Sequence, residues 1–305
     1  MTGVLGYRGW RTVLILSLLS WHGQAAEIEA GMLERSLASD ESLVAAHRGC
    51  WRLAPENSLA AMDACIAMGV HMLEIDVRRS ADGRLVVIHD RTLDRTTASS
   101  GAVNELPAER VLGLRLREGS GGSDAPLTAE VLPSLPQALH HLKGRTLINL
   151  DVKDPVLPEV IAAVSALDMN DQVLLKAVVD SPQSSSFPST ETLQGITFMP
   201  IIRPQNGEPA ERIARFAETG VKAFEVIFED EPQLRAACAA AQKMGARCWV
   251  NTMWDYLSPG HADDQAHLAP DAHWGHLQRL GVTMIQTDRP GALLDYLNGT
   301  AGNRE

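Results

Sequence analysis

Short apolar runs alternate with amphipathic stretches along most of the chain, and this alternation constrains the fold more than any other feature of the sequence. It is typical of parallel β/α units, in which a helix follows each strand and crosses back over the sheet. Nine runs predict strands: 43–47, 71–77, 84–89, 146–153, 173–179, 197–203, 223–228, 247–252 and 283–288. At 305 residues and 45% hydrophobic side chains, the pattern fits either two domains or one large α/β barrel.

The amphipathic stretches between these runs predict helices over 58–68, 158–167, 209–219, 232–244 and 272–280. Asn57 and Gly69 are suited to cap the first of them. Nine strands exceed the eight of a barrel by one, and the join 77–84 is too short for a crossover helix. It forms either a hairpin around Asp82 and Gly83 or an extended return to a parallel strand. Two segments rich in Ser and Gly predict exposed loops, 118–124 and 181–191.

The first 26 residues differ from the rest of the chain. They carry Arg8 and Arg11, then the apolar run 13–19, then small residues. This order is typical of a secretory signal peptide, and the run is shorter than the roughly 20 apolar residues that cross a bilayer. We therefore predict a signal peptide over 1–26, a mature domain over 27–305 that is secreted or periplasmic, and no stable membrane insertion after cleavage.

The chain is acidic, with 27 Lys and Arg against 38 Asp and Glu and a net charge of −11. Cleavage of the signal would remove two arginines and no acidic residue, which takes the charge to −13. A field of this sign repels nucleic acids and anionic membrane surfaces. We therefore expect a small-molecule substrate and no nucleic-acid partner, and any phosphate must be bound by a local cluster of positive charge. The oligomeric state is not fixed by the sequence.

Four cysteines, Cys50, Cys65, Cys238 and Cys248, lack the C-x-x-C spacing of a zinc site. Export permits disulfides without requiring them, and the sequence does not fix a pairing. Cys65 lies in a helical stretch of small and apolar residues, and Cys248 begins an apolar strand. This setting favours buried, unpaired cysteines that act as small hydrophobic residues.

Two of the predicted strands place carboxylates together. Because successive side chains of a strand point to opposite faces, Glu74 and Asp76 share one face, and Asn149, Asp151 and Lys153 share one face of a later strand. Two like charges in a strand buried on both sides are costly unless a cation or proton neutralises them. A hard divalent ion, Mg²⁺ or Ca²⁺, would do so; the alternative is a pair of solvated carboxylates at a strand end.

Two further strands end in a histidine, His47 and His89. Active sites of parallel α/β folds lie at the C-terminal ends of strands, and two histidines can divide the acid and base roles of a reaction. A single histidine at the end of a strand is more often structural. Here four predicted strands end in polar side chains, and this combination favours an active site.

The segment 45–97, which contains "AAHRG", "PENS", "LEIDVRR" and "VVIHDRT", resembles the glycerophosphodiester phosphodiesterase family. The likeness continues through "LPSLPQAL", "LINLDVKD" and "GVTMIQTDRP" and is weak over 197–271. The resemblance implies a single-domain TIM-like (β/α)8 barrel, with a small insertion after the third strand, and a metal-dependent phosphodiesterase site. By motif position it implies catalytic His47 and His89, metal ligands Glu74, Asp76 and Asp151, and phosphate-binding Arg48 and Lys153. Glu56 of "PENS" belongs either to helix entry or to the site.

The implied activity is hydrolysis of glycerophosphodiesters to glycerol 3-phosphate and an alcohol. One divalent cation, Mg²⁺ or Ca²⁺, would neutralise phosphoryl charge while the histidines act as acid and base. In the family the attacking group is thought to be the neighbouring hydroxyl of the substrate. The alternatives are a phospholipase D-like lyase that acts on intact phospholipids, against which the acidic charge argues, and a non-catalytic binding barrel.

The late part of the chain departs from the family pattern. "CWVNTMWD" adds Trp254, which together with Trp51 and Trp249 can line a pocket, although Trp249 also suits a core. The long segment 255–280 carries His261 close to Asp263 and Asp264. This cluster would suit a second metal site or a substrate lid, but polar loop residues favour a solvated loop.

Overall fold

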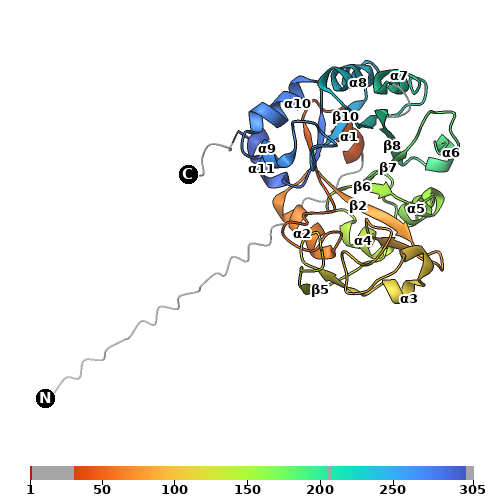
Figure 1. Ribbon diagram of the computed structural model, residues 1–305, viewed down its shortest axis with the longest axis vertical. Coiled ribbons are helices and arrows are strands. Elements are labelled where there is room, and N and C mark those ends of the chain that lie inside the picture. The colour runs from red at the N-terminus through yellow and green to blue at the C-terminus, as the bar shows by residue number, and fades with distance from the viewer. Residues whose placement is uncertain (2–30, 205–207, 300–305) are drawn as a thin grey trace.

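The computed structural model describes Met1 and residues 31–204 and 208–299; apart from Met1, the predicted signal peptide at 1–26 lies outside the described residues. Eight parallel strands form a closed barrel (Figure 1). In barrel order they are β1 (Leu43–Ala46), β2 (Met72–Arg79), β6 (Leu147–Val152), β7 (Val173–Val178), β8 (Thr197–Ile202), β9 (Ala223–Val226), β10 (Arg247–Asn251) and β11 (Met284–Thr287). β1 closes the barrel because it pairs with both β2 and β11. The single TIM-like barrel is confirmed.

Helices cover the outside of the barrel, and most of them follow a strand. They are α2 (Leu59–Met68), α4 (Leu135–Leu142), α5 (Leu157–Ser165), α6 (Thr190–Leu193), α7 (Pro209–Ala214), α8 (Glu231–Lys243), α9 (Asp263–Ala266), α10 (His276–Arg279) and α11 (Pro290–Leu297). A large apolar core lies between these helices and the strands. The predicted helix 272–280 is instead a π-helical turn, η3 (Asp271–Gly275), followed by α10.

Helix α1 (Met32–Ala38), which the sequence pattern did not predict, closes the N-terminal end of the barrel. Its buried Leu33 and Leu37 pack on inward side chains from the starts of the strands, among them Met72 and Trp249. The apolar plug leaves the C-terminal end of the barrel as the end where polar groups gather.

The ninth predicted strand is β3 (Leu85–Val87), and it lies outside the barrel. It pairs antiparallel with β2, and a tight turn that contains Gly83, at φ +85°, connects the two strands. Of the two readings of this join, the hairpin is therefore correct. Such a turn favours glycine because side chains rarely adopt positive φ.

An insertion of residues 88–134 follows β3, as predicted. It contains η1 (Val103–Glu105), α3 (Ala108–Val111) and a hairpin of β4 (Arg115–Arg117) with β5 (Leu127–Val131). The predicted loop 118–124 connects β4 to β5. The insertion has its own apolar cluster and projects from one side of the barrel (Figure 1). Within the described residues, no helix is both long and apolar enough to cross a membrane.

The two predicted caps of α2 have different outcomes. Gly69 ends the helix at φ +75°, as predicted. The N-cap is Ser58, whose hydroxyl accepts a hydrogen bond from the amide of Ala61, and not Asn57. Asn57 instead has φ +59° and bonds through its side chain to both the amide and the carboxylate of Asp76. A residue that resembles a helix cap therefore holds a site carboxylate.

Candidate active site

A cavity of about 470 Å³ opens at the C-terminal end of the barrel. Six of the seven predicted site residues line it: His47, Arg48, Glu74, His89, Asp151 and Lys153. The seventh, Asp76, is fully buried, ion-paired with Lys153 and hydrogen-bonded by the side chain of Asn57. A larger hollow of about 810 Å³ lies at the opposite end, beside α1 and α6, away from these groups.

The three predicted metal ligands lie together because of the strand register. Asp76 on β2 is paired directly with Asp151 on β6, and Glu74 lies two residues earlier on the same inward face. One carboxylate oxygen from each residue lies within 4.8 Å of the others. Glu74 and Asp76 are buried, so these three charges are held close in a poorly solvated place.

The electrostatics of this trio fit a divalent cation. Burial and the adjacent charge of Asp76 raise the pKa of Glu74 to about 8. Oδ1 of Asp76 is buried and has no hydrogen-bond donor among the described residues, although the Lys153 ammonium lies 3.1 Å away. Three carboxylates are a typical ligand set for a hard cation. The donor set therefore fits Mg²⁺ or Ca²⁺, and the shorter Asp151 is close enough to take part.

The two predicted cations, Lys153 and Arg48, border the trio. The ammonium of Lys153 lies 2.6 Å from Oδ2 of Asp151 and 3.1 Å from Oδ1 of Asp76. Burial alone would raise the pKa of Asp76, but the positive charges of Lys153 and Arg48 outweigh it and hold that pKa well below its usual range. The backbone of Arg48 adopts φ +52°, and its amide donates to Oε2 of Glu74 at 2.9 Å. These contacts place two positive side chains where a phosphate anion can reach them.

His47 lies at the end of β1 and is held by a residue far away in sequence. Its Nδ1 donates to Oδ1 of Asp288, directly after β11, at 2.7 Å. Burial lowers the pKa of His47, while the hydrogen bond to Asp288 opposes that shift. The Asp288 contact fixes the tautomer and leaves Nε2 as the nitrogen that can exchange a proton with a substrate.

His89 is held in the same manner by its neighbour, and the contacts continue towards Arg48. Nδ1 of His89 lies 2.8 Å from Asp90, which in turn accepts two hydrogen bonds from Arg95. Arg95 also makes two bonds to Glu56, which is buried and accepts from Arg48 at 3.0 Å. Glu56 therefore belongs to the site as an ion-pair partner and does not cap α2.

The insertion completes this network. Arg95 donates to the carbonyl oxygen of Ser120, and the amide of Glu56 donates to that of Gly119 at 2.8 Å. Gly121 has φ +76°, and a side chain there would collide with the backbone of Arg95. The loop 118–124, predicted only to be exposed, thus holds Arg95 in place.

Several site residues were not predicted from the sequence. Lys176 is buried on β7 and donates to Glu225 at 2.9 Å and to Gln286 at 3.0 Å, and Gln286 in turn donates to Glu74. A charged residue inside an otherwise apolar strand was the available signal for Lys176. Asp288 ends a predicted strand, as His47 does, so the same rule would have found it.

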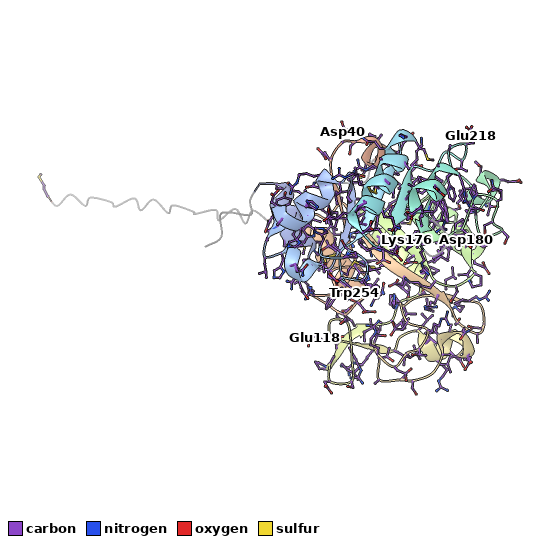
Figure 2. The ribbon with its side chains drawn as sticks, turned by 45° about the horizontal axis from the view of Figure 1, so that its top comes forward. Asp40, Glu118, Lys176, Asp180, Glu218 and Trp254 are labelled. Atoms are coloured by element: carbon purple, nitrogen blue, oxygen red, sulfur yellow. A yellow bond between two sulfur atoms is a disulfide. The ribbon has the colours of Figure 1, made fainter. Side chains whose placement is uncertain are left out.

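The three tryptophans have separate roles. Trp254 meets the ring of His47 edge-on at 5.4 Å and stacks on Tyr256 at the mouth of the cavity. It lies between the barrel and the insertion (Figure 2). Trp249 is fully buried in the barrel core, and Trp51 donates its indole N–H to Asp288. Of these three tryptophans, Trp254 alone lines the pocket.

The predicted cluster of His261, Asp263 and Asp264 does not form, and it is not a solvated loop either. Asp263 is buried and accepts hydrogen bonds from the hydroxyls of Thr252 and Thr287 and from the amide of Asp288. Asp264 is exposed, whereas His261 is buried and faces Glu231. Asp263 thus supports Asp288 from behind and takes part in no metal site.

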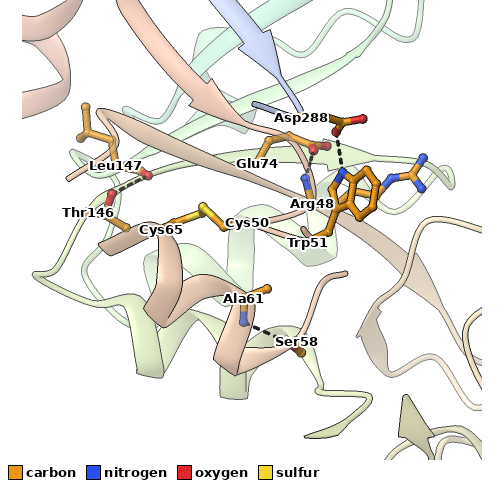
Figure 3. The surroundings of a disulfide bond; sticks show 10 residues. All are labelled: Arg48, Cys50, Trp51, Ser58, Ala61, Cys65, Glu74, Thr146, Leu147 and Asp288. Carbon is orange, nitrogen blue, oxygen red and sulfur yellow. Dashed lines mark hydrogen bonds between the residues drawn. A yellow bond between two sulfur atoms is a disulfide. The ribbon is translucent and has the colours of Figure 1, made fainter. Parts of the chain in front are cut away.

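The cysteines are buried as predicted, but the expectation that they are unpaired is wrong. Cys50 is bonded to Cys65, and Cys238 to Cys248. The first disulfide joins the turn after β1 to α2, close to Arg48 and Trp51 (Figure 3). Sequence alone could not show that these pairs approach closely, because both contacts depend on how a helix packs on the barrel.

Comparison with known proteins supports the earlier resemblance. "Glycerophosphodiester phosphodiesterase" of Caldanaerobacter subterraneus subsp. tengcongensis is 29% identical over 147 residues, 45% of this chain and 58% of that protein. "Probable glycerophosphodiester phosphodiesterase 1" of Mycobacterium tuberculosis is 36% identical over 121 residues, 37% of this chain and 43% of that protein. The chain thus spans about half the length of the curated relatives it matches. A family model described as a domain of unknown function matches residues 198–297.

Solved structures match nearly the whole barrel. The glycerophosphodiester phosphodiesterase of Agrobacterium tumefaciens has a TM-score of 0.61 and 27% identity, covering 83% of this chain and 98% of that chain. The chain is a TIM barrel whose curated and structural neighbours are consistently named glycerophosphodiester phosphodiesterases. A glycerophosphoryl diester phosphodiesterase of Parabacteroides distasonis shares the fold at a TM-score of 0.72 and 19% identity, covering 92% and 96% of the two chains.

Proposed function

We propose that this chain hydrolyses glycerophosphodiesters to glycerol 3-phosphate and an alcohol, with one divalent cation. The observation that carries the proposal is the convergence of three carboxylates, two cations and two histidines on one cavity of about 470 Å³. Each histidine is oriented by its own aspartate. This set matches what cleavage of a phosphodiester anion requires: charge neutralisation and two proton transfers.

The residues of the chain divide this work. Arg48 and Lys153 would bind the phosphate oxygens and orient the diester against the carboxylate trio. A Mg²⁺ or Ca²⁺ ion held by Glu74, Asp76 and Asp151 would supply neutralisation of charge on a non-bridging oxygen. One of His47 and His89 would take a proton from the attacking oxygen, and the other would protonate the departing alkoxide.

The substrate class rests on the relatives. The names of the curated relatives give glycerophosphodiesters as their substrates, and a phosphodiesterase of Oleispira antarctica with this fold has been solved with the product sn-glycerol-3-phosphate. The cavity is wide enough for a small diester, and Trp254 with Tyr256 offers an apolar wall for the alcohol. Glycerophosphocholine, glycerophosphoethanolamine and glycerophosphoinositol are the candidates that we propose.

We further propose that the chain is exported and works outside the cytoplasm. Signal-like features at residues 1–26 support this location. The two disulfides support it independently, because disulfides persist in oxidising compartments and are rare in the cytosol. Fractionation of the source cells, with detection of the N-terminus of the secreted form, would test it; a cytoplasmic chain that retains Met1 would contradict it.

Release of glycerol 3-phosphate from the three candidate diesters tests the proposed activity. Protein stripped with EDTA should be inactive, and Mg²⁺ or Ca²⁺ should restore release. His47→Ala and Glu74→Ala should each abolish it, whereas His140→Ala, at an exposed residue of α4, should leave it unchanged. If the protein binds metal but releases no glycerol 3-phosphate from any of the diesters, the proposal is contradicted. Activity on an intact phospholipid alone would instead favour the lyase reaction.

A further inference from the structure

A second cluster of metal-ligating side chains lies at the same end of the barrel, outside the cavity. Glu231 begins α8, His261 lies in the loop between β10 and α9, and His276 begins α10. One ligand atom of each lies within 4.8 Å of the others. The three residues come from three separate segments of the chain. The fold therefore brings them together, because they are far apart in the sequence.

The distances match a tetrahedral metal shell. Nε2 of His261 lies 3.3 Å from Oε1 of Glu231, and Nε2 of His276 lies 3.0 Å from Oε2 of the same carboxylate. Zinc binds imidazole nitrogen and carboxylate oxygen at about 2.0–2.2 Å, which places neighbouring ligand atoms of a tetrahedron roughly 3.3 Å apart. The two imidazole rings stack at 5.1 Å with an interplanar angle of 24°, and the Nε2 atom of each contacts the Glu231 carboxylate.

His276 provides an independent indication that a ligand is needed. Its Nε2 is buried and lies 3.0 Å from Oε2 of Glu231, a short contact with poor hydrogen-bond geometry. A buried nitrogen of this kind costs free energy unless something binds it. A metal ion between the ring and the carboxylate would satisfy it.

The surrounding backbone is built to aim these side chains. His276 follows directly on the π-helical turn η3, a rare geometry that is frequent at functional sites. A Cβ at Gly275 in that turn would require the side-chain ends of Tyr296 and Asp271 to shift. Nδ1 of His273 lies 3.0 Å from the carbonyl oxygen of Gly260 and 3.3 Å from Nδ1 of His261, so the His273 ring packs against the outer side of His261.

We propose that Glu231, His261 and His276 form a second metal site for a borderline divalent ion such as Zn²⁺, which ties the loop between β10 and α9 to the start of α8. Two imidazoles and one carboxylate suit zinc, whereas Mg²⁺ and Ca²⁺ prefer the oxygen-only trio in the barrel. Half of the Glu231 side chain is exposed, which leaves a fourth position open to water. The site is separate from the proposed phosphodiesterase centre.

The tied loop is the one that carries Trp254. Trp254, which contacts His47, lies near the start of this loop, and His261 lies near its end. Within the loop, the amide of Gly260 donates a hydrogen bond to the side chain of Asp255. A metal at His261 would restrain this loop against α8. The site would therefore hold the aromatic wall of the cavity in place.

Cobalt binding to the full chain without an affinity tag tests the site. The protein is stripped with EDTA, supplied with excess Mg²⁺ to fill the carboxylate trio, and titrated with Co²⁺ while visible absorption reports four-coordinate metal. We expect one equivalent to bind, and Zn²⁺ to displace it. Glu74→Gln, which impairs the trio, and His140→Ala, which removes an unrelated histidine, should leave this binding unchanged.

His276→Ala and Glu231→Gln should each weaken Co²⁺ binding by more than the roughly 10- to 100-fold that loss of an outer contact costs. Glu231→Gln changes a half-exposed side chain and keeps its shape, so it guards against a folding defect in His276→Ala. Absence of four-coordinate absorption in the wild type, or binding equally tight in both variants, would overturn the site.

Hydrogen exchange tests the tie to the loop. Zn²⁺ in the presence of Mg²⁺ should slow amide exchange in residues 252–262 of the wild type, and Glu231→Gln should abolish the slowing. Exchange that stays unchanged while Zn²⁺ binds would overturn the restraint on the loop. Neither measurement uses turnover, so a failed proposal here is distinguishable from a failed assignment of activity.

Discussion

At the scale of single residues, the side chains that the sequence predicts are those at the ends of strands. His47, Glu74 and Asp151 follow from alternation along a strand and from the rule that active sites lie at its C-terminal end. Their partners do not follow, because they come from distant positions. Asp288 is 241 residues from His47, and Gln286 is 212 from Glu74. The sequence thus predicts the reacting groups better than the groups that orient them.

Replacement of Asp288 by Asn should move the pH profile to lower pH. The carboxylate raises the pKa of His47 against the effect of burial, so its loss lets that pKa fall further. One limb of the pH profile of kcat/KM reports the titration of His47. In Asp288→Asn that limb should shift to lower pH, and the maximum value of kcat/KM should fall. An unshifted limb would mean that His47 does not titrate in the reaction. Asp264→Asn, an exposed aspartate in the same region, is the control.

The two histidines can be separated by the leaving group. Protonation matters for a choline or ethanolamine alkoxide but not for p-nitrophenolate, which departs without a proton. We expect one of His47→Ala and His89→Ala to recover activity on a p-nitrophenyl diester of glycerol phosphate, and the other to stay inactive. The rescued variant lacks the acid. Rescue of both, or of neither, would contradict a division of acid and base roles.

At the scale of elements, all nine predicted strands are present, because short apolar runs between polar turns carry a clear signal. The sequence did not decide how β2 connects to β3, because the same residues can form either a hairpin or an extended return to a parallel strand. It also missed α1 and the β4–β5 hairpin. β5 alternates exposed and half-exposed residues and contributes little to the core, so its hydrophobic signal is weak.

Loss of the Cys50–Cys65 disulfide should destabilise the chain by about 3 kcal/mol, the entropy of closing a loop of roughly 15 residues in the unfolded state. Urea unfolding of Cys50→Ala with Cys65→Ala should show this fall in the free energy of unfolding. The double variant at Cys238 and Cys248 is the matched control, and its shorter loop of 10 residues should cost slightly less. Equal stability of the wild type with and without reductant would exclude both bonds.

At the scale of the whole molecule, the barrel concentrates charge at one end. The N-terminal end is filled by α1 and apolar side chains, whereas the other end holds buried carboxylates and cations. Such a barrel folds at a cost in electrostatic free energy, which a bound cation would offset. The acidic chain as a whole therefore depends on local positive charge, from Arg48, Lys153 and Lys176, to admit an anionic substrate.

Metal should stabilise the entire barrel, and the effect should depend on Glu74. Because the pKa of Glu74 is raised to about 8 in the fold, the native state holds a proton that the unfolded state releases above about pH 4.5. Glu74 should therefore cause the metal-free protein to lose stability as the pH rises from about 4.5 to 8. Mg²⁺ or Ca²⁺ at 100 times its Kd should restore roughly 2.7 kcal/mol at pH 8.

Thermal unfolding with and without the ion, across this pH range, measures both effects. Glu74→Gln should flatten the fall in stability with pH and remove most of the gain from metal, since it deletes both the titrating group and a ligand. Lys143→Gln, which removes a charge just after α4 and far from the trio, should behave as the wild type. A metal-induced rise in Tm that survives in Glu74→Gln would place the stabilising ion elsewhere. In that case the trio of Glu74, Asp76 and Asp151 would be an ion-pair network closed by Lys153, Arg48 and Lys176.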